Sequence, residues 1–403
     1  MRDLLKFSDL PEYAFPRLRI LLKDVSAPGH EVPLHIGEPT HNFPSFIKEK
    51  ILENFNGFNS YPPNDGTPGL LSGIANWLSS RYKIPVPDFE KNIISLNGTR
   101  EGLFNATISL SPSSKNGQIP AILLPNPFYQ CYMVAAKAVG AEPIFVPAIN
   151  ETGFLPDFSQ LPKAILDRTT ICYICSPSNP QGAVATEKYW KNLFYLAETH
   201  DFKILADECY SEIYHKEKPI GAIECLNKFN MDPERLVIFN SLSKRSNLPG
   251  LRSGFAASGE KVIAELKKLR AYSGAPCPSP LQFAAEAAWR DENHVEDNRR
   301  QYSEKLNLAD QIFQKTKNYK SPEAGFFLWL QVDDGEIATV ELWKKFGVKV
   351  LPGVYLSNEN YKTFDSLNPG KQFIRIALVR PTDELISGLN AISQYLNERK
   401  NKG

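Results

Sequence analysis

Residues 203–210 read Lys-Ile-Leu-Ala-Asp-Glu-Cys-Tyr, and residues 236–244 read Leu-Val-Ile-Phe-Asn-Ser-Leu-Ser-Lys. Each stretch begins with a mainly apolar run and continues into polar residues, a pattern typical of a strand that is buried on both faces. Similar apolar runs lie at residues 93–96, 121–124, 144–146 and 171–175. Helix-like stretches separate the runs. The sequence therefore predicts an α/β fold with a mostly parallel sheet between helices.

Two of the separating stretches show the helical period clearly. Residues 70–78 have apolar side chains on one helical face and follow Pro68, which suits a first helical turn. Residues 130–139 form a second such stretch, which Gly140 can close.

The alternation of apolar strand-like runs with helix-like stretches ends at about residue 258. Helices are expected there at 259–271, 280–290, 292–317 and 382–398, and strands at 326–330, 349–351 and 373–377. We therefore expect a large α/β domain over residues 45–290. Residues 1–44 and 291–403 would together form a smaller α+β domain.

Composition excludes several classes of protein. The 403 residues contain 46 Lys and Arg against 45 Asp and Glu, so the net charge is only +1. A protein that coats nucleic acid or a membrane surface would show a basic excess. The chain lacks the long apolar run of a spanning helix, and its first residues lack the apolar core of a signal peptide. We expect a cytoplasmic protein with neither nucleic acid nor membrane as partner.

The familiar short motifs of phosphate loops, dinucleotide sites, zinc proteases and serine hydrolases are absent, and the six histidines show no metal spacing. The six cysteines are scattered, which argues against a disulfide framework. Cys172 and Cys175 lie three residues apart within an apolar strand, so we interpret them as buried core cysteines. No metal site is predicted.

Polar groups follow three of the predicted strands where each one ends. Lys244 follows the strand at 236–239 and precedes Arg252, while Asp207 and Tyr210 follow the strand at 203–206, and Asn179 follows 171–175. Parallel strands end at the same edge of a sheet, which is where open α/β sheets bind ligands. Pyridoxal 5′-phosphate (PLP) needs a lysine for its aldehyde, an acid for its ring nitrogen and anion-binding groups for its phosphate. The combination therefore indicates a PLP site.

Four stretches resemble, in the right order, the motifs of the class I/II aminotransferases of PLP fold type I. They are His35–Pro39, Ser176–Gly182, Asp207–Tyr210 and Ser241–Arg252. The resemblance covers almost the whole chain and implies a mostly parallel, seven-stranded type of sheet between helices, with a smaller α+β domain beside it. The chain departs from the family at Gln181, where a threonine is usual, and this change concerns the substrate side of the loop.

The resemblance implies a role for each residue around the cofactor. Lys244 would form the internal aldimine with PLP and later shuttle the substrate proton, with Asp207 holding the proton of the ring nitrogen. Asn179 and Tyr210 would bind the phenolic oxygen, and Tyr129 would stack on the ring.

The cofactor phosphate would be bound by Ser241, Arg252 and the turn that contains Thr99 and Arg100. That turn opens a helix, whose N-terminus suits an anion. Tyr61 resembles a tyrosine that reaches the phosphate of a neighbouring subunit. The resemblance thus implies a homodimer with a shared active site.

For the amino acid and 2-oxo acid substrates, Arg375 alternates with apolar residues in a strand, and its guanidinium suits an α-carboxylate. The family pattern adds the backbone of Gly37 and the amide of Asn179 to this site. Arg100 and Arg245 are candidates for any further carboxylate of the substrate.

Four stretches narrow the resemblance to a subgroup, the bacterial succinyldiaminopimelate aminotransferases. They are residues 10–18, 97–101, 241–247 and 293–302. The implied reaction converts N-succinyl-LL-2,6-diaminopimelate and 2-oxoglutarate to N-succinyl-2-amino-6-oxopimelate and glutamate, in lysine and diaminopimelate biosynthesis.

Several alternatives remain beside this reaction. They are an aspartate, alanine, aromatic or LL-diaminopimelate aminotransferase, and a PLP-dependent lyase of C–S bonds. A non-catalytic regulator would carry a DNA-binding domain ahead of this one, and only some 40 residues precede the expected large domain. We therefore expect an enzyme.

Overall fold

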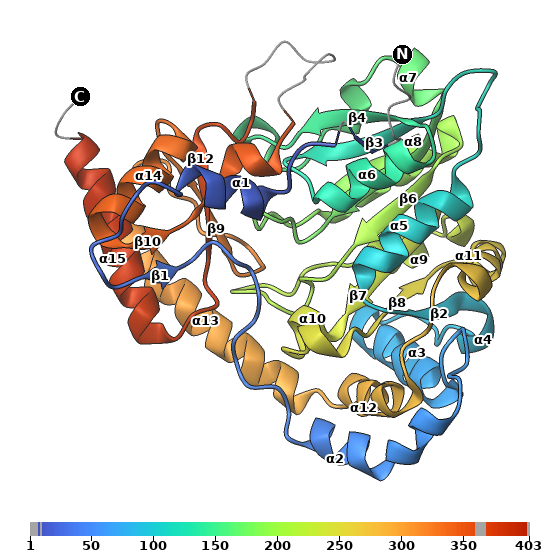
Figure 1. Ribbon diagram of the computed structural model, residues 1–403. Coiled ribbons are helices and arrows are strands. Elements are labelled where there is room, and N and C mark those ends of the chain that lie inside the picture. The colour runs from blue at the N-terminus through green and yellow to red at the C-terminus, as the bar shows by residue number, and fades with distance from the viewer. Residues whose placement is uncertain (1–6, 9, 359–367, 401–403) are drawn as a thin grey trace.

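The computed structural model describes residues 7–8, 10–358 and 368–400. Its largest element is a seven-stranded sheet with the order β2-β8-β7-β6-β5-β3-β4 (Figure 1). The strands are β2 (Ile93–Leu96), β3 (Ala121–Asn126), β4 (Glu142–Pro147), β5 (Thr169–Cys175), β6 (Lys203–Asp207), β7 (Leu236–Ser241) and β8 (Gly254–Ala257). Strands β3 to β7 pair in parallel, whereas β8 runs antiparallel to both of its neighbours. The expected α/β fold with a mostly parallel sheet is confirmed.

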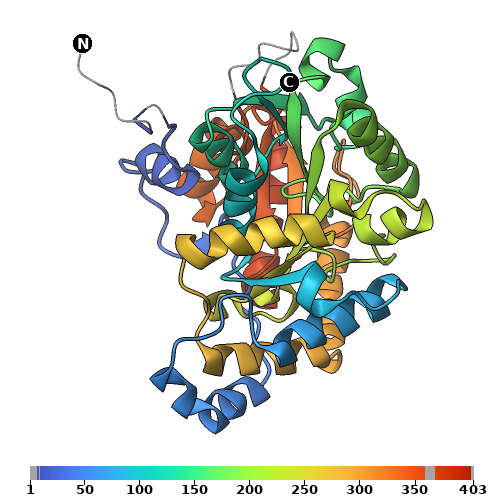
Figure 2. The same cartoon turned by 90° about the vertical axis from the view of Figure 1, so that its right-hand side faces the viewer.

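Both faces of this sheet are buried under helices. Alternate residues of β7 show this, because Leu236 and Ile238 join one hydrophobic cluster and Val237 and Phe239 join another. The first cluster lies under α3 (Pro68–Tyr82), α8 (Glu187–His200), α9 (Ala222–Lys228) and α12 (Ser279–Arg290). The second lies under α5 (Thr99–Leu110), α6 (Gln130–Ala138) and α11 (Glu260–Ser273), the last of which crosses the front of Figure 2. Burial on both faces explains why the strands are apolar at successive positions.

A second, smaller group of strands lies to one side of the large sheet (Figure 1). An antiparallel sheet has the order β11-β12-β9, and two short strands, β1 and β10, pair in parallel. Their bounds are β1 (Val32–Pro33), β9 (Phe327–Gln331), β10 (Val348–Lys349), β11 (Leu351–Pro352) and β12 (Phe373–Ala377). Helices α13 (Asn293–Phe313), α14 (Gly335–Phe346) and α15 (Thr382–Lys400) contribute to one hydrophobic cluster with these strands. Segments from both ends of the chain thus share one core.

The remaining helices are short. They are α1 (Ala14–Leu21), α2 (Phe46–Glu53), α4 (Phe89–Asn92), α7 (Lys163–Leu166) and α10 (Leu242–Arg245). Helix α10 is a single turn that directly follows β7, and it contains Lys244. None of the helices in the described ranges combines the length and the hydropathy that a membrane crossing requires.

The structure differs from the sequence prediction in several places, and α14 and β1 are among the elements that were not predicted. Strand β8 was not predicted, because its Gly-Phe-Ala-Ala run is short and only weakly apolar. The run at 349–351 is divided at Val350, with β10 pairing to β1 and β11 to β12. The helix predicted at 292–317 ends at Phe313, where the N–H of Thr316 closes a turn by donating to the Phe313 carbonyl over 2.7 Å. The division into domains at residues 45 and 290 stays a prediction.

Candidate active site

A cavity of about 410 Å³ lies where β5, β6 and β7 end. The large sheet and its loops contribute Asn179, Asp207, Ser241 and Lys244 to its wall, and β12 contributes Arg375 from the small sheet. Gly37, Thr99, Arg100, Tyr129, Tyr210 and Arg252 also line this cavity. Eleven of the thirteen residues selected from the sequence are thus brought together, and Tyr61 and Arg245 are the exceptions. Their individual roles stay predictions.

Lys244 is the only lysine among the described residues that line this cavity. Its Nζ donates a hydrogen bond of 2.8 Å to the carbonyl oxygen of Gly37. Burial is the main cause that lowers the pKa of Lys244 to about 8, and the cations Arg375 and Arg252 act in the same direction. At pH 7 about a tenth of such amines is neutral. A neutral lysine amine is what covalent capture of an aldehyde needs.

Asp207 ends β6 and is 6% exposed. Its Oδ2 accepts a hydrogen bond of 2.9 Å from the Tyr132 hydroxyl, and its Oδ1 accepts one of 3.3 Å from the backbone N–H of Cys209. Burial raises the pKa of Asp207, while these two bonds and the charge of Lys244 oppose the shift. Within the described ranges no cation forms an ion pair with this carboxylate. A protonated ring nitrogen would supply the missing partner, so the site fits PLP here.

Asn179 and Tyr210 lie together in the cavity wall. The Asn179 Nδ2 donates to the Tyr210 hydroxyl over 3.5 Å, and its Oδ1 accepts from the Arg375 Nη1 over 3.2 Å. Burial raises the pKa of Tyr210, which keeps its phenol protonated and able to donate. Nearby, the Arg100 Nε donates to the Tyr129 hydroxyl.

An anion-binding corner is formed by Ser241, Arg252 and the first turn of α5, which begins at Thr99. The Arg252 guanidinium donates to the carbonyl oxygens of Pro249 over 2.9 Å and of Asn97 over 2.8 Å. Gly98 has a φ of +82°, and a Cβ there would lie 2.2 Å from the Arg252 Nη2. Glycine is therefore required for the arginine to lie against the helix N-terminus. Free N–H groups, a hydroxyl and a guanidinium suit a phosphate.

Arg375 projects from the small sheet and is 5% exposed. Its Nη2 donates to the His35 carbonyl oxygen over 3.0 Å, its guanidinium carbon lies 4.3 Å from the centre of the Phe327 ring, and its buried Nε has no hydrogen-bond partner. Burial lowers its pKa to about 10. No carboxylate within the described ranges pairs with this cation. It is therefore poised to bind the carboxylate of a ligand.

Two sequence-based candidates lie elsewhere. The prediction that Arg245 binds a substrate carboxylate is wrong, because its side chain is fully buried and has other partners. It donates to the Ala288 carbonyl oxygen over 2.7 Å and to the Glu292 carboxylate over 2.5 Å. Tyr61 is fully exposed and does not line the cavity of its own chain. Its contact with a partner subunit, and the homodimer itself, stay predictions.

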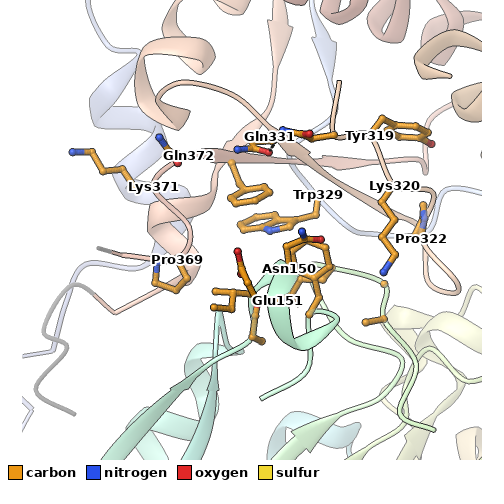
Figure 3. Close-up of a pocket in the computed structure, with 18 of the residues that line it drawn as sticks. Asn150, Glu151, Tyr319, Lys320, Pro322, Trp329, Gln331, Pro369, Lys371 and Gln372 are labelled. Atoms are coloured by element: carbon orange, nitrogen blue, oxygen red, sulfur yellow. Dashed lines mark hydrogen bonds between the residues drawn. The ribbon is translucent and has the colours of Figure 1, made fainter. Parts of the chain in front are cut away.

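Gln181 faces a different cavity, of about 810 Å³, which lies between the two sheets. Its Nε2 donates to the Ala148 carbonyl over 3.4 Å. Figure 3 shows this larger cavity, with Trp329 and Gln331 of β9 on one side and Asn150 and Glu151 on the other. The departure from the usual threonine therefore lies in the wall of the larger cavity, and Gln181 does not line the Lys244 cavity.

The structure adds one residue to the site that sequence reasoning missed. Tyr132 is fully buried, and its hydroxyl donates to Asp207. It lies on α6 one helical turn after Tyr129, within a stretch where it resembles any core aromatic. Cys172 and Cys175 are buried and free, which confirms their interpretation as core cysteines. Among the described residues, no group of three or more His, Cys, Asp or Glu side chains could hold a metal ion.

Comparisons with known proteins agree on one family. The model of the family "Aminotransferase class I and II" matches residues 30–392. An LL-diaminopimelate aminotransferase of Dehalococcoides mccartyi is 28% identical over 98% of this chain and 98% of its own. An aspartate aminotransferase of Pyrococcus horikoshii is also 28% identical, over 95% of each chain. The crystal structure of an aminotransferase from Neisseria meningitidis has a TM-score of 0.92 at 37% identity and covers 97% of this chain and 99% of its own. The chain therefore belongs to the class I and II aminotransferases.

Proposed function

We propose that the protein transfers an amino group between an amino acid and a 2-oxo acid, using PLP bound at Lys244. One observation carries the proposal. A buried amine with a lowered pKa, an unpaired buried carboxylate and an anion-binding corner line a single cavity, formed by Lys244, Asp207 and the Arg252 region. PLP has an aldehyde, a ring nitrogen and a phosphate that complement these three groups.

Each group of residues has a separate task in this proposal. PLP, when bound, supplies an electron sink for the negative charge that develops at the substrate Cα. Asp207 keeps the proton on the ring nitrogen, and Tyr132 and the Cys209 N–H hold this carboxylate in place. Tyr210 and Asn179 donate to the phenolic oxygen. Lys244 removes the proton from Cα through its Nζ, and a pKa of about 8 makes this amine a usable base near neutral pH.

Arg375 binds the α-carboxylate of the substrate in this account. Its guanidinium is held by His35, Asn179 and the Phe327 ring, and it lacks a carboxylate partner within the described ranges. The Arg375 Nη1 donates a hydrogen bond to Asn179, and the Lys244 Nζ donates one to Gly37. Asn179 and Gly37 both line the same cavity. The substrate Cα would therefore be held beside the amine that must remove its proton.

We further propose LL-diaminopimelate as the amino substrate. Sequence resemblance favoured the N-succinylated compound, whereas several curated relatives at 27–28% identity are named LL-diaminopimelate aminotransferase. The cavity lining also includes both Glu38 and Arg100. The distal end of LL-diaminopimelate carries an ammonium and a carboxylate, which complement these two charges. Succinylation replaces the ammonium by a neutral amide, and so removes the partner of Glu38.

Substrate choice can be tested by following the cofactor absorption in single-turnover half-reactions. The donors would be LL-diaminopimelate, N-succinyl-LL-diaminopimelate, glutamate, aspartate, alanine and phenylalanine. We expect LL-diaminopimelate and glutamate to react fastest, and Glu38→Gln to slow LL-diaminopimelate more than the succinylated compound. Faster reaction of the succinylated compound would restore the substrate favoured by resemblance. A leading rate for aspartate or phenylalanine would exclude both diaminopimelate compounds.

Replacement of Arg375 tests the carboxylate site. Arg375→Ala should raise the KM of every amino donor by roughly 30-fold or more, because a buried charge-assisted pair is lost. Arg300→Ala is a matched control, since Arg300 is exposed and its ion pair among the described residues is with Asp297 on the same helix. Unchanged KM values for Arg375→Ala would show that Arg375 does not bind the substrate carboxylate.

The amine of Lys244 should titrate well below an ordinary lysine. Its pKa is about 8 rather than 10.5 because burial penalises the charged form. In the cofactor-free protein, acetylation of Lys244 should accelerate from pH 6 to about pH 8 and then level off, because only the neutral amine reacts. Peptide mass spectrometry measures this rate, and the Lys244→Arg variant identifies the labelled peptide. A rate that still rises steeply above pH 9 would contradict the lowered pKa.

A further inference from the structure

The residues that follow Lys244 are held by the start of α13 and the turn before it. The Arg245 Nη2 donates to Glu292 over 2.5 Å, and the Ser246 hydroxyl bonds to the His294 Nε2 over 2.8 Å. Residues 241–247 and 293–302 both belong to the stretches that narrow the sequence resemblance to a subgroup, and the structure places them against each other.

Asn298 of α13 makes the closest connection to Lys244 itself. The Asn298 side chain is 3% exposed, and its Nδ2 donates to the backbone carbonyl oxygens of Lys244 and Arg245, over 3.2 Å each. Its Oδ1 accepts from the Asn247 Nδ2 over 2.9 Å and from the His41 Nδ1 over 3.1 Å. A carboxamide has two donor hydrogens and two acceptor lone pairs. All four are used here, so the orientation of this side chain is fixed.

The same bonds determine the protonation of His41. An amide oxygen can only accept, so the Nδ1 of His41 carries the hydrogen and its Nε2 is free to accept. The Lys305 Nζ lies 2.6 Å from this Nε2 and donates to it. Lys305 is 4% exposed, and its other hydrogen bond, of 3.2 Å, goes to the Val379 carbonyl oxygen. No carboxylate within the described ranges pairs with Lys305. Its hydrogen bonds to His41 and Val379 therefore offset the free-energy cost of burying this amine.

The half-buried His41 and the buried Asn298 and Lys305 thus form a polar clamp that joins three parts of the active site. Asn298 holds the turn of Lys244. Lys305 holds Val379, which closely follows the strand that carries Arg375. His41 lies in the same loop as Gly37, whose carbonyl oxygen accepts from the Lys244 amine. The clamp therefore fixes the amine of Lys244 relative to the guanidinium of Arg375.

We propose that Asn298 is a positioning residue for Lys244, with His41 and Lys305 holding Asn298 in place. The proposal rests on the proposed function of Lys244 as the reactive amine. Helix α13 extends from beside α12 to beneath α15 (Figure 1), so it reaches both the Lys244 turn and the core of the small sheet. A small displacement of the amine from the substrate Cα costs a large factor in rate. The clamp limits that displacement by anchoring the backbone of Lys244 at its carbonyl.

Two measurements on Asn298→Ala test the clamp. Backbone hydrogen exchange in residues 242–248 of the cofactor-free protein should become roughly tenfold faster, because two hydrogen bonds to this turn are lost. With cofactor, kcat should fall roughly tenfold while the KM for the amino donor changes little, because Arg375 is untouched. The exchange measurement does not depend on activity. If the wild-type protein were inactive, the proposed function would fail. The exchange measurement would still test whether Asn298 holds the turn of Lys244.

Three further variants serve as comparisons. Gln301→Ala removes an exposed side chain of the same helix and should change neither measurement. Within the described part of the chain, this side chain donates to the Asp297 carbonyl oxygen in that helix. His41→Ala should raise the exchange of residues 242–248, and His41→Asn should restore it, because a carboxamide can replace the Nδ1–H donor. Exchange and kcat that stay at wild-type values in Asn298→Ala would overturn the proposal. So would equal losses in Gln301→Ala and Asn298→Ala.

Discussion

In the cofactor-free protein, the hydrogen bond from the Lys244 amine to the Gly37 carbonyl oxygen joins the two parts of the chain on which the active site depends. Lys244 follows β7 of the large sheet, whereas Gly37 lies in a loop near the small sheet. The neighbouring Leu34 donates from its N–H to Lys349 and accepts at its carbonyl from Ala377. The bond therefore links the two sheets across the cavity. It also gives the buried amine a hydrogen-bond partner, while burial is the main cause that lowers the pKa of Lys244.

Unbalanced charge is the common property of the groups around this cavity. Asp207 lacks a cation, and Arg375 lacks a carboxylate, within the part of the chain that is described. Burying such groups costs free energy unless a ligand supplies the opposite charge. In the proposed function this cost is offset, because PLP and an amino acid together carry complementary charges. The unpaired charges of Asp207 and Arg375 thus select a ligand as much as the cavity volume of about 410 Å³ does.

Much of the fold follows from local sequence, because strands buried on both faces are apolar at successive positions. The ends of β5, β6 and β7 could be located for the same reason, and with them Asn179, Asp207 and Lys244. Side chains that act through tertiary contacts could not be predicted. Arg245 follows Lys244 directly, yet it points to α12 and α13 because its partners Ala288 and Glu292 lie there. The bonds of Asn298 likewise depend on residues more than 50 positions away.

The central claim is that Lys244 is the residue that binds PLP covalently. Lys305 is an internal control, because it is also buried and has a pKa lowered to about 8. Lys305 donates to His41 and Val379 and does not line the Lys244 cavity. The direct measurement is incubation with PLP, reduction with borohydride and peptide mass mapping. We expect the phosphopyridoxyl group on Lys244. Its attachment to Lys305, or to no single lysine, would contradict a covalent role for Lys244.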